Sequence, residues 1–540
     1  MSQTRSVTPA HFVAATLVFV ATVWLVIRQR YYAGWVDDDA FITFRYARNL
    51  AEGHGLVFNV GERVEGYTNF LWTVILAALY KLGADLPSAA RALGAVCSVS
   101  TAGVVLAFAR TRAWSVPENV PRAVAPVLAV TAAAILCVSD SWAAWAAGGL
   151  ENTLSALLVT AAFLAYVRAQ ESGSEVERQR ALLTAAVTLA LAILNHPANA
   201  LFVAPILLDR IVRRRAHDGA PAGVAVLVFV TIVGVWTAWR LWYYGDILPN
   251  TFHAKVGFTR FVLQRGVSYF GEVLRALPLA YAAVLGLGIL SLRRPGLRRS
   301  IGLPGSAVAL HTAYVVGIGG EQFPALRSVV VVLPLLALLM QSACNELCRS
   351  WMRGGKHAGM AIVVATVAFV GAGHAVILYV SPRIRVLDRA LDEGRTALST
   401  AAAMRLKELL PRETLFAHSG AGLIAFYTNF PWIDTLGLTD RHIARTQVDD
   451  MGRGAAGHEK GDGAYVWSRR PDYVMFPGYP ISNRTPGTKG GRELVAIPEF
   501  SSTYRPVRLP FEFQGPHDAE PRQHVLFLWQ RIGAPPPSGG

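Results

Sequence analysis

Long apolar segments recur through the first two thirds of the chain and limit the folds that it can adopt. The sequence has 540 residues, of which 53% are hydrophobic and only 16% are charged. Stretches of about 15 to 23 apolar residues match the length that a helix needs to cross a bilayer. The sequence therefore predicts a mainly α-helical, polytopic membrane protein.

The loops between these segments carry the basic residues and predict the topology. The net charge of +15 comes largely from arginines clustered in loops near residues 110–122, 168–180, 210–215, 293–299 and 349–356. Placing all of these loops on the cytoplasmic side of the membrane follows the positive-inside rule. The positive charge is then explained without a nucleic-acid partner. About eleven crossings result, at 10–27, 88–109, 121–139, 148–167, 181–195, 198–213, 221–241, 278–292, 300–318, 325–347 and 358–380.

The first outward loop, 28–87, follows a segment without a convincing signal-peptidase site, so 10–27 is interpreted as an uncleaved anchor. Two apolar stretches then precede the next basic loop, and the parity of the crossings requires that one of them does not cross. We expect 67–82 to be a re-entrant or interfacial helix. The four cysteines indicate no disulfide framework.

The composition changes after residue 381, where charge, glycine and proline increase. A helix is expected near 384–410, and LFAHSGAGLIAFYT, PDYVMF and HVLFLWQ are typical of strands or strand–turn units. These features predict a membrane domain at 1–380, a soluble α/β domain at 381–530 on the outer side, and a disordered tail at 531–540.

Three consecutive carboxylates, Asp37, Asp38 and Asp39, follow the first crossing. Neighbouring charges about 5 Å apart repel by roughly 3 kcal/mol at an effective dielectric near 20, so the cluster needs a physical reason. One interpretation is a cap at the N-terminus of a helix spanning 40–51. The alternative is a catalytic or ligand-binding cluster at the water–bilayer boundary.

Further polar residues fall in the outward loops and are candidates for substrate binding. They are Arg45, Glu65, Glu151, His196, Arg240, Tyr244, Asn250, His253, Lys255, Glu321 and Arg327. Helix 40–51 is amphipathic, and Arg45 and Arg48 either face lipid phosphates or form a solvated face. For the others, ion pairing, helix capping, a turn or an interfacial aromatic belt remain the structural alternatives.

The chain lacks a P-loop, a G-x-S-x-G motif and clustered metal-ligand spacing. A reaction outside the membrane that uses a lipid-carried activated group fits this pattern better than a nucleotide-driven one.

Several motifs then resemble a known family. DDDAFITFRYARNL, GGLENTL, WYYGDILPNTFHAK, GGEQFPALR, DTLGLTDRHIA and GHEKGDGAYV occur in an order similar to that of the terminal arabinofuranosyltransferases of mycobacterial cell walls and their bacterial relatives. These belong to the GT-C class of membrane glycosyltransferases. The resemblance implies a polyprenyl-phosphate sugar donor, a cell-envelope glycan acceptor, inversion at the anomeric carbon and a plasma-membrane location with the site on the outer face.

By position, Asp38 and Asp39 match the aspartate pair of this family, Asp37 is an additional acid, and Glu151 matches its G-L-E loop. We expect Asp38 to be the general base and Asp39 to orient the acceptor, with Arg240, Lys255 and Arg327 stabilising the departing phosphate. A divalent cation on Asp38 and Asp39 is a further possibility, and no cofactor is otherwise implied.

The chain departs from the family pattern at two turns, which read His196-Pro197-Ala198 and Gly319-Gly320-Glu321. An arabinofuranosyl donor is favoured, and a mannosyl- or other hexosyltransferase acting on protein or glycan is the alternative. A non-enzymatic transporter of lipid-linked sugar would place its polar groups nearer the mid-membrane, and a scaffold protein leaves the aspartates unexplained. Asp434–Asp440 and His458–Lys460 are expected to serve as scaffold or in domain docking.

Overall fold

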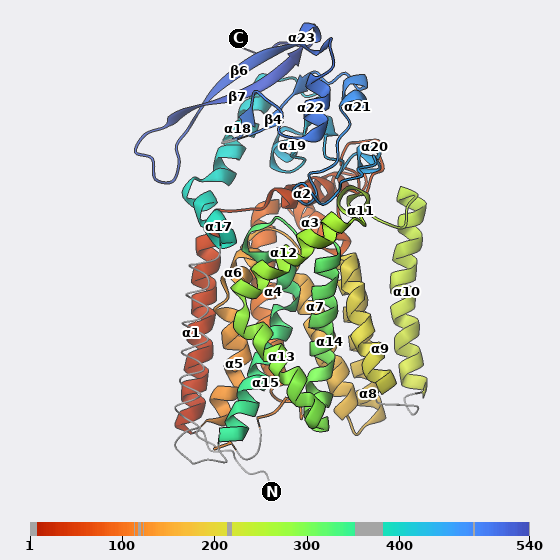
Figure 1. Cartoon of the computed structure of the whole chain (residues 1–540), viewed down its shortest axis with the longest axis vertical. Helices are drawn as coiled ribbons and strands as arrows, with labels where there is room; N and C mark the ends of the chain where they lie inside the picture. Colours follow the sequence, from red (N-terminus) through yellow and green to blue (C-terminus); the bar gives the residue numbers. More distant parts are fainter. Residues whose placement is uncertain are drawn as a thin grey trace.

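The computed structural model describes residues 8–112, 114–116, 120–121, 124–212, 219–351, 382–478 and 481–538. A bundle of helices carries a second domain of helices and strands at one end (Figure 1). The bundle contains α1 (Pro9–Tyr32), α4 (Leu86–Phe108), α5 (Ala125–Cys137), α6 (Asp140–Ala147), α7 (Asn152–Glu171), α8 (Glu175–Asn195), η1 (Pro197–Phe202), α9 (Val203–Val212), α10 (Gly219–Tyr244), α12 (Arg260–Ala276), α13 (Pro278–Arg293), α14 (Pro295–Gly317), η2 (Pro324–Val332) and α15 (Leu333–Trp351). Three shorter helices, α2 (Asp38–Ala51), α3 (Phe70–Lys81) and α11 (Asn250–Lys255), lie where the two domains meet (Figure 1).

Five helical segments of the described chain are long and apolar enough to cross a membrane. They are α1, α4, α7, Ala222–Tyr244 of α10 and the continuous stretch Pro324–Arg349. Two bent pairs, α5 with α6 at 52° and α12 with α13 at 97°, raise the number to as many as seven. The chain is a multi-pass membrane protein, as predicted. The eleven crossings stay a prediction, and the segment 358–380 lies outside the described residues.

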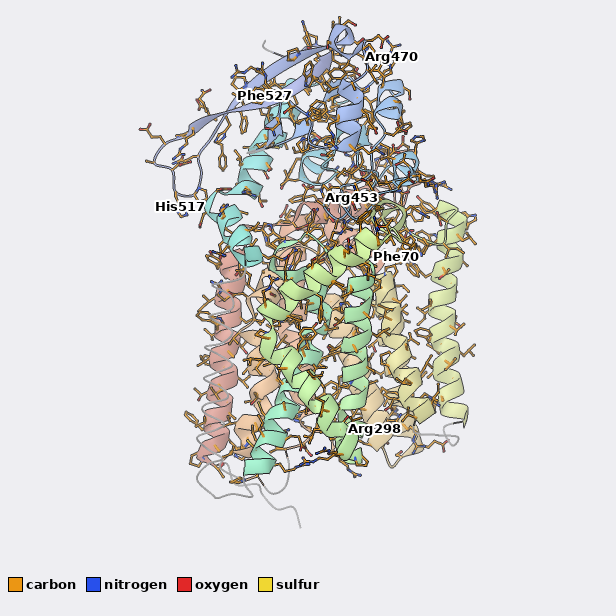
Figure 2. The ribbon with its side chains drawn as sticks, viewed as in Figure 1. Phe70, Arg298, Arg453, Arg470, His517 and Phe527 are labelled. Carbon is orange, nitrogen blue, oxygen red and sulfur yellow. The ribbon has the colours of Figure 1, made fainter. Side chains whose placement is uncertain are left out.

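The segment 67–82 forms α3, which has 12 residues. At 1.5 Å per residue its length is about 18 Å, well short of the roughly 30 Å hydrocarbon core. This length agrees with the expectation that the segment does not cross. The basic loop at 293–299 lies at the opposite end of the bundle from the second domain, as Arg298 shows (Figure 2).

Two parts of the bundle differ from the sequence prediction. The crossing expected at 121–139 corresponds to α5, and the residues that follow it form the buried helix α6 after a 52° bend. The segment 242–277, expected to be an outward loop, contains α11 and the 17-residue helix α12. Both α11 and α12 carry polar and charged residues, so hydropathy alone did not reveal them.

The C-terminal domain is α/β, as predicted. Its elements are α17 (Pro382–Asp392), α18 (Arg395–Leu409), β1 (Phe416–His418), α19 (Leu423–Thr428), β2 (Trp432–Asp434), α20 (Arg441–Ala444), α21 (Gly463–Ser468), β3 (Tyr473–Val474), β4 (Phe476–Pro477), β5 (Ser482–Asn483), α22 (Lys489–Val495), α23 (Phe500–Thr503), β6 (Tyr504–Phe513) and β7 (Arg522–Arg531). The main sheet has the strand order β2-β1-β3-β7-β6, with β1 parallel to β2 and β3 and with β7 antiparallel to β3 and β6.

Three details of this domain correct the sequence prediction. Residues 423–428, expected within a strand–turn unit, form helix α19. The helix expected near 384–410 is divided into α17 and α18 at Gly394, whose φ is 60°. Residues of the predicted disordered tail contact the domain, since Tyr473 donates a hydrogen bond to the Pro535 carbonyl at 2.8 Å.

Helix α2 is packed between the bundle and the C-terminal domain. The rings of Phe41 and Phe44 lie 5.7 and 6.1 Å from the ring of Phe426 on α19. Arg45 is only 3% exposed and donates hydrogen bonds of 2.8 Å to the carbonyls of Phe58, Ala425 and Phe430. The expectation that Arg45 and Arg48 face lipid or solvent is therefore wrong for this helix. Apart from the nearby Phe58 carbonyl, these partners come from a part of the chain about 380 residues away, which helical periodicity cannot indicate.

Candidate active site

The three aspartates occupy the first turn of α2, and each has a different environment. Asp37 is the N-cap residue, and its carboxylate accepts a hydrogen bond from the Asp39 N–H at 3.0 Å. Burial, together with the negative charge of Asp39, raises the pKa of Asp37 above its usual range. The cap interpretation thus explains Asp37 and leaves Asp38 and Asp39 for another role.

Asp38 is held by the C-terminal domain. Its Oδ1 accepts a hydrogen bond from the backbone N–H of Leu423, the first residue of α19, at 2.8 Å. The preceding residue must be small, because a Cβ on Gly422 would lie 2.0 Å from the carbonyl oxygen of Asp38. Asp38 has exposed surface, yet the protein packed around its carboxylate desolvates it and raises its pKa to about 6, although the N–H donors of Leu423 and Gly422 act in the opposite direction. The result is an oriented carboxylate that titrates near neutrality.

Asp39 instead faces a cation. Its Oδ2 lies 3.3 Å from Nζ of Lys255, the last residue of α11. Burial opposes the ionised form of Asp39, but the charges of Lys255 and Arg327 outweigh it and hold the pKa of Asp39 below its usual range. Asp39 is therefore ionised at neutral pH.

Arg327 provides a second cation in the same region. Its Nε lies 3.2 Å from Oε2 of Glu321, and its guanidinium carbon lies 3.5 Å from the centre of the Phe323 ring. Glu321 also accepts a hydrogen bond from the Tyr269 hydroxyl at 3.1 Å. A guanidinium fork and a lysine point charge are the two side-chain types that most often bind phosphate oxygens.

These charged groups line one cavity of about 180 Å³ between the two domains. The membrane domain contributes Asp38, Asp39, Lys255, Glu321 and Arg327. The C-terminal domain contributes Ser419, Gly420, Ala421, Leu436, Leu438 and the segment 456–458. Asp38 remains exposed to this space. Residues of both domains thus line the space that a substrate would occupy.

Glu151 and His196 lie close to this site without lining it. The buried Glu151 accepts a hydrogen bond from the Asn69 amide at 2.7 Å, and its backbone carbonyl accepts one from the Asn195 amide at 3.2 Å. His196 accepts a hydrogen bond from the Ala198 N–H through Nδ1 at 3.3 Å. The charge of Glu151 acts on both His196 and Arg327. A direct contact of either residue with substrate stays a prediction.

Comparison with known proteins gives two family matches. Residues 70–272 match the Alg9-like mannosyltransferase family, and residues 385–525 match a family described as a domain of unknown function. The terminal β-(1→2)-arabinofuranosyltransferase of Corynebacterium glutamicum is 26% identical over 379 residues, which are 63% of this chain and 52% of the relative. The enzyme of the same name from Mycobacterium tuberculosis is 27% identical over 301 residues, 54% of this chain and 46% of the relative. The chain thus spans about half the length of these curated relatives.

Solved structures agree with these matches at the level of the fold. ArnT from Cupriavidus metallidurans in the apo state has a TM-score of 0.53 at 15% identity, covering 96% of this chain and 98% of ArnT. The same protein bound to undecaprenyl phosphate has a TM-score of 0.52 at 16% identity, covering 79% and 86%. The chain resembles the GT-C membrane glycosyltransferases. The resemblance that the sequence motifs indicated is therefore confirmed.

Two residues predicted for the GT-C site bind each other instead of lining the cavity. Arg240 on α10 and Glu65 of the first loop form a bidentate ion pair with distances of 2.7 to 3.1 Å. Both side chains are about 5% exposed or less, and Arg240 Nη1 also donates to the Ile247 carbonyl. Of the three cations expected to face the phosphate, the structure thus brings Lys255 and Arg327 to the cavity and leaves Arg240 in a contact between α10 and the first loop.

Tyr244, Asn250 and His253 also have partners of their own. The Tyr244 hydroxyl donates to the Leu56 carbonyl at 2.8 Å. The Asn250 amide donates to the carbonyls of Gly437 and Leu438, and His253 lies 3.0 Å from Asp246. The Asn250 contacts hold the start of α11 against the C-terminal domain and thereby position Lys255. Direct substrate contacts by the three residues stay predictions.

The C-terminal wall of the cavity is what sequence reasoning missed. His458, expected to be scaffold or docking, lines the cavity and lies 2.9 Å from the Gln322 amide through Nδ1. Its neighbour Glu459 does follow the scaffold expectation, because it accepts a hydrogen bond from the Gly454 N–H at 3.0 Å. In the sequence, the segment 456–458 is distinguished only by the GHEK motif. Nothing in the spacing of that motif links the segment to the aspartates.

No group of three or more His, Cys, Asp or Glu side chains in the described part of the chain is arranged as a metal site. The nearest positive charge to Asp39 comes from Lys255. Metal binding at Asp38 and Asp39 stays a prediction.

Proposed function

We propose that this protein is an inverting glycosyltransferase that moves a sugar from a polyprenyl-phosphate donor to a hydroxyl of a cell-envelope glycan, on the outer face of the bacterial plasma membrane. The observation that carries the proposal is the combination, in one cavity, of the oriented carboxylate of Asp38 with the cations Lys255 and Arg327. A direct displacement at an anomeric carbon needs a base on one side and an anion-stabilising group on the other.

In this proposal Asp38 removes the proton from the acceptor hydroxyl as its oxygen bonds to the anomeric carbon. The bond from that carbon to the phosphate oxygen breaks, and its electron pair leaves on the lipid phosphate. Lys255 and Arg327 stabilise the charge that develops there. Asp39, kept ionised by Lys255, orients the acceptor or stabilises the oxocarbenium-like charge.

An arabinofuranosyl donor is favoured because two relatives are named as terminal β-(1→2)-arabinofuranosyltransferases. A hexosyl donor is the second candidate, since the Alg9-like mannosyltransferase family matches residues 70–272. The polyprenyl-phosphate carrier is supported by the undecaprenyl phosphate bound to ArnT, which has the same fold.

The test is transfer by the purified protein in detergent, with synthetic decaprenyl-phosphate arabinofuranose or decaprenyl-phosphate mannose and an arabinan acceptor. We expect product from the arabinofuranose donor, and Asp38→Asn should reduce kcat on the order of a thousandfold. Asp449→Asn, at an exposed site in the C-terminal domain, is the matched control and should retain full activity. Undiminished transfer by the Asp38 variant contradicts the assignment of the base. Product formed only from the mannose donor selects the second candidate.

A further inference from the structure

A second cavity lies on the outer side of the same domain junction. Its volume is about 670 Å³, within the range of ligand-binding pockets. Residues 62–64 of the first loop form one wall, residues 440–446 around α20 form another, and Tyr465 and Arg469 of α21 complete it. We refer to this cavity as the outer groove. None of its lining residues belongs to the catalytic cavity.

A pair of stacked rings forms a platform in the outer groove. The imidazole of His442 lies 4.1 Å from the ring of Tyr465 with an interplanar angle of 16°. Asp462 fixes the imidazole at 2.8 Å, and the Tyr465 hydroxyl donates to Asp440 at 3.0 Å. The His442 side chain is nevertheless 51% exposed. A flat ring held in one orientation with an open surface is suited to pack against the C–H face of a sugar ring.

Hydrogen-bond donors surround this platform. Arg441 donates to the carbonyls of Arg63 and Tyr244, and Arg469 donates to the Tyr465 hydroxyl at 2.6 Å. Arg445 pairs with Asp246 at 2.6 Å. A guanidinium has five N–H donors in a plane, so each of these contacts leaves donors for a ligand. Rings flanked by such donors and by the acceptors Glu62 and Asp440 match the alternating apolar faces and hydroxyls of a carbohydrate.

The outer groove is connected to the catalytic cavity by short stretches of chain. Leu438 lines the catalytic cavity and Asp440 lines the outer groove. Asn250, at the start of α11, donates to the carbonyls of both residues, whereas Lys255, at the end of α11, reaches Asp39. Helix α11 has six residues and is therefore on the order of 10 Å long. A few linked sugar residues can cover this distance.

We infer that the outer groove binds the body of the acceptor glycan, a linear oligosaccharide whose reacting end extends to Asp38. This inference rests on the proposed function and adds a binding site for the part of the acceptor that does not react.

The experiment compares two acceptors of the same linkage, an arabinofuranosyl disaccharide and a longer arabinofuranosyl oligosaccharide. His442→Ala should raise KM for the long acceptor about fivefold, the effect of losing one stacking contact. It should leave kcat, and KM for the disaccharide, unchanged. Tyr465→Phe keeps the ring pair and should stay near wild type, whereas Tyr465→Ala should behave like His442→Ala. His517→Ala, a 75% exposed histidine at the far end of the β6–β7 hairpin (Figure 2), is the matched control.

A direct binding measurement separates this inference from the proposed function. The Asp38→Asn protein should bind the long oligosaccharide in saturation-transfer NMR, and adding His442→Ala should weaken that binding. If binding depends on His442 but no sugar donor is consumed by the wild type, the proposed function fails and the glycan site stands. If transfer occurs and His442→Ala changes KM for neither acceptor, or for both equally, the inference is overturned.

Discussion

Asp38 and Asp39 are adjacent in sequence, yet the protein gives their carboxylates opposite tendencies to ionise. Burial raises the pKa of Asp38 to about 6. The charges of Lys255 and Arg327, which outweigh burial, lower the pKa of Asp39. Pairs of carboxylates whose environments separate their pKa values in this way commonly divide the roles of base and fixed charge. The division here assigns the proton transfer to Asp38.

This assignment predicts a pH dependence. Asp38 acts as a base only when deprotonated, so kcat/KM should be constant above about pH 7 and fall roughly tenfold per pH unit below about pH 6. An aspartate with an ordinary pKa would keep the enzyme active to about pH 4. The profile is measured with the purified enzyme at subsaturating acceptor, with the Asp449→Asn variant in parallel. Activity that persists unchanged to about pH 5 would contradict a catalytic base with a raised pKa.

The sequence indicated which charged residues line the site, but it did not indicate which residues they contact. Asp38, Asp39, Lys255, Glu321 and Arg327, predicted from outward loops, do line one cavity. The sequence does not show which of these residues are engaged in long-range contacts. Glu65 and Arg240 pair with each other although 175 residues separate them, and helical spacing gives no information about such a contact.

At the scale of secondary-structure elements, two short helices position the site. Helix α19 directs the N–H of Leu423 at Asp38, and α11 places Lys255 beside Asp39. Neither helix was predicted, because each has only six residues and no amphipathic period can be read from so few. Strand β6 was missed for a different reason. It contains Pro506 and Pro510, which are tolerated because β6 is at the edge of the sheet.

The close approach of α19 to Asp38 makes Gly422 a sensitive position. In Gly422→Ala the new Cβ would lie 2.0 Å from the Asp38 carbonyl oxygen and 2.4 Å from its Oδ2, so Asp38 must move. A displacement of about 1 Å can lower kcat on the order of a hundredfold. KM for the lipid donor should change little, because Lys255 and Arg327 are not displaced. Steady-state kinetics test this, with Gly487→Ala as control, since a Cβ there meets nothing within 4 Å. Equal kcat in the two variants would contradict the positioning role of α19.

At the scale of the whole molecule, the catalytic cavity exists only because the two domains are packed together. The membrane domain supplies the acids and cations, and the C-terminal domain supplies the opposite wall and the hydrogen bond that orients Asp38. The sequence predicted both domains and their order. The sequence could not predict the interface between the two domains. The hydrogen bonds across this interface join residues of α2 and the first loop to residues more than 370 positions later, and no periodic pattern marks either partner.

The junction should therefore control both stability and catalysis, and Arg45 tests this. Its buried guanidinium donates to carbonyls of the first loop and of the C-terminal domain. Arg45→Ala removes three hydrogen bonds that a buried charged donor makes to these carbonyls and should cost about 3 to 5 kcal/mol in the free energy of unfolding. Arg298→Ala, at the exposed opposite end of the bundle (Figure 2), is the control and should cost less than about 0.5 kcal/mol.

The thermal unfolding midpoint in detergent measures the effect on stability. The effect on catalysis is measured as kcat at a temperature where both variants are folded. We expect Arg45→Ala to lower both, because a loosened C-terminal domain no longer holds the N–H of Leu423 against Asp38. Arg45→Lys keeps the charge but loses the planar fork, so it should be intermediate. A lower midpoint with unchanged kcat in the folded protein would mean that the domain junction stabilises the molecule without positioning the base.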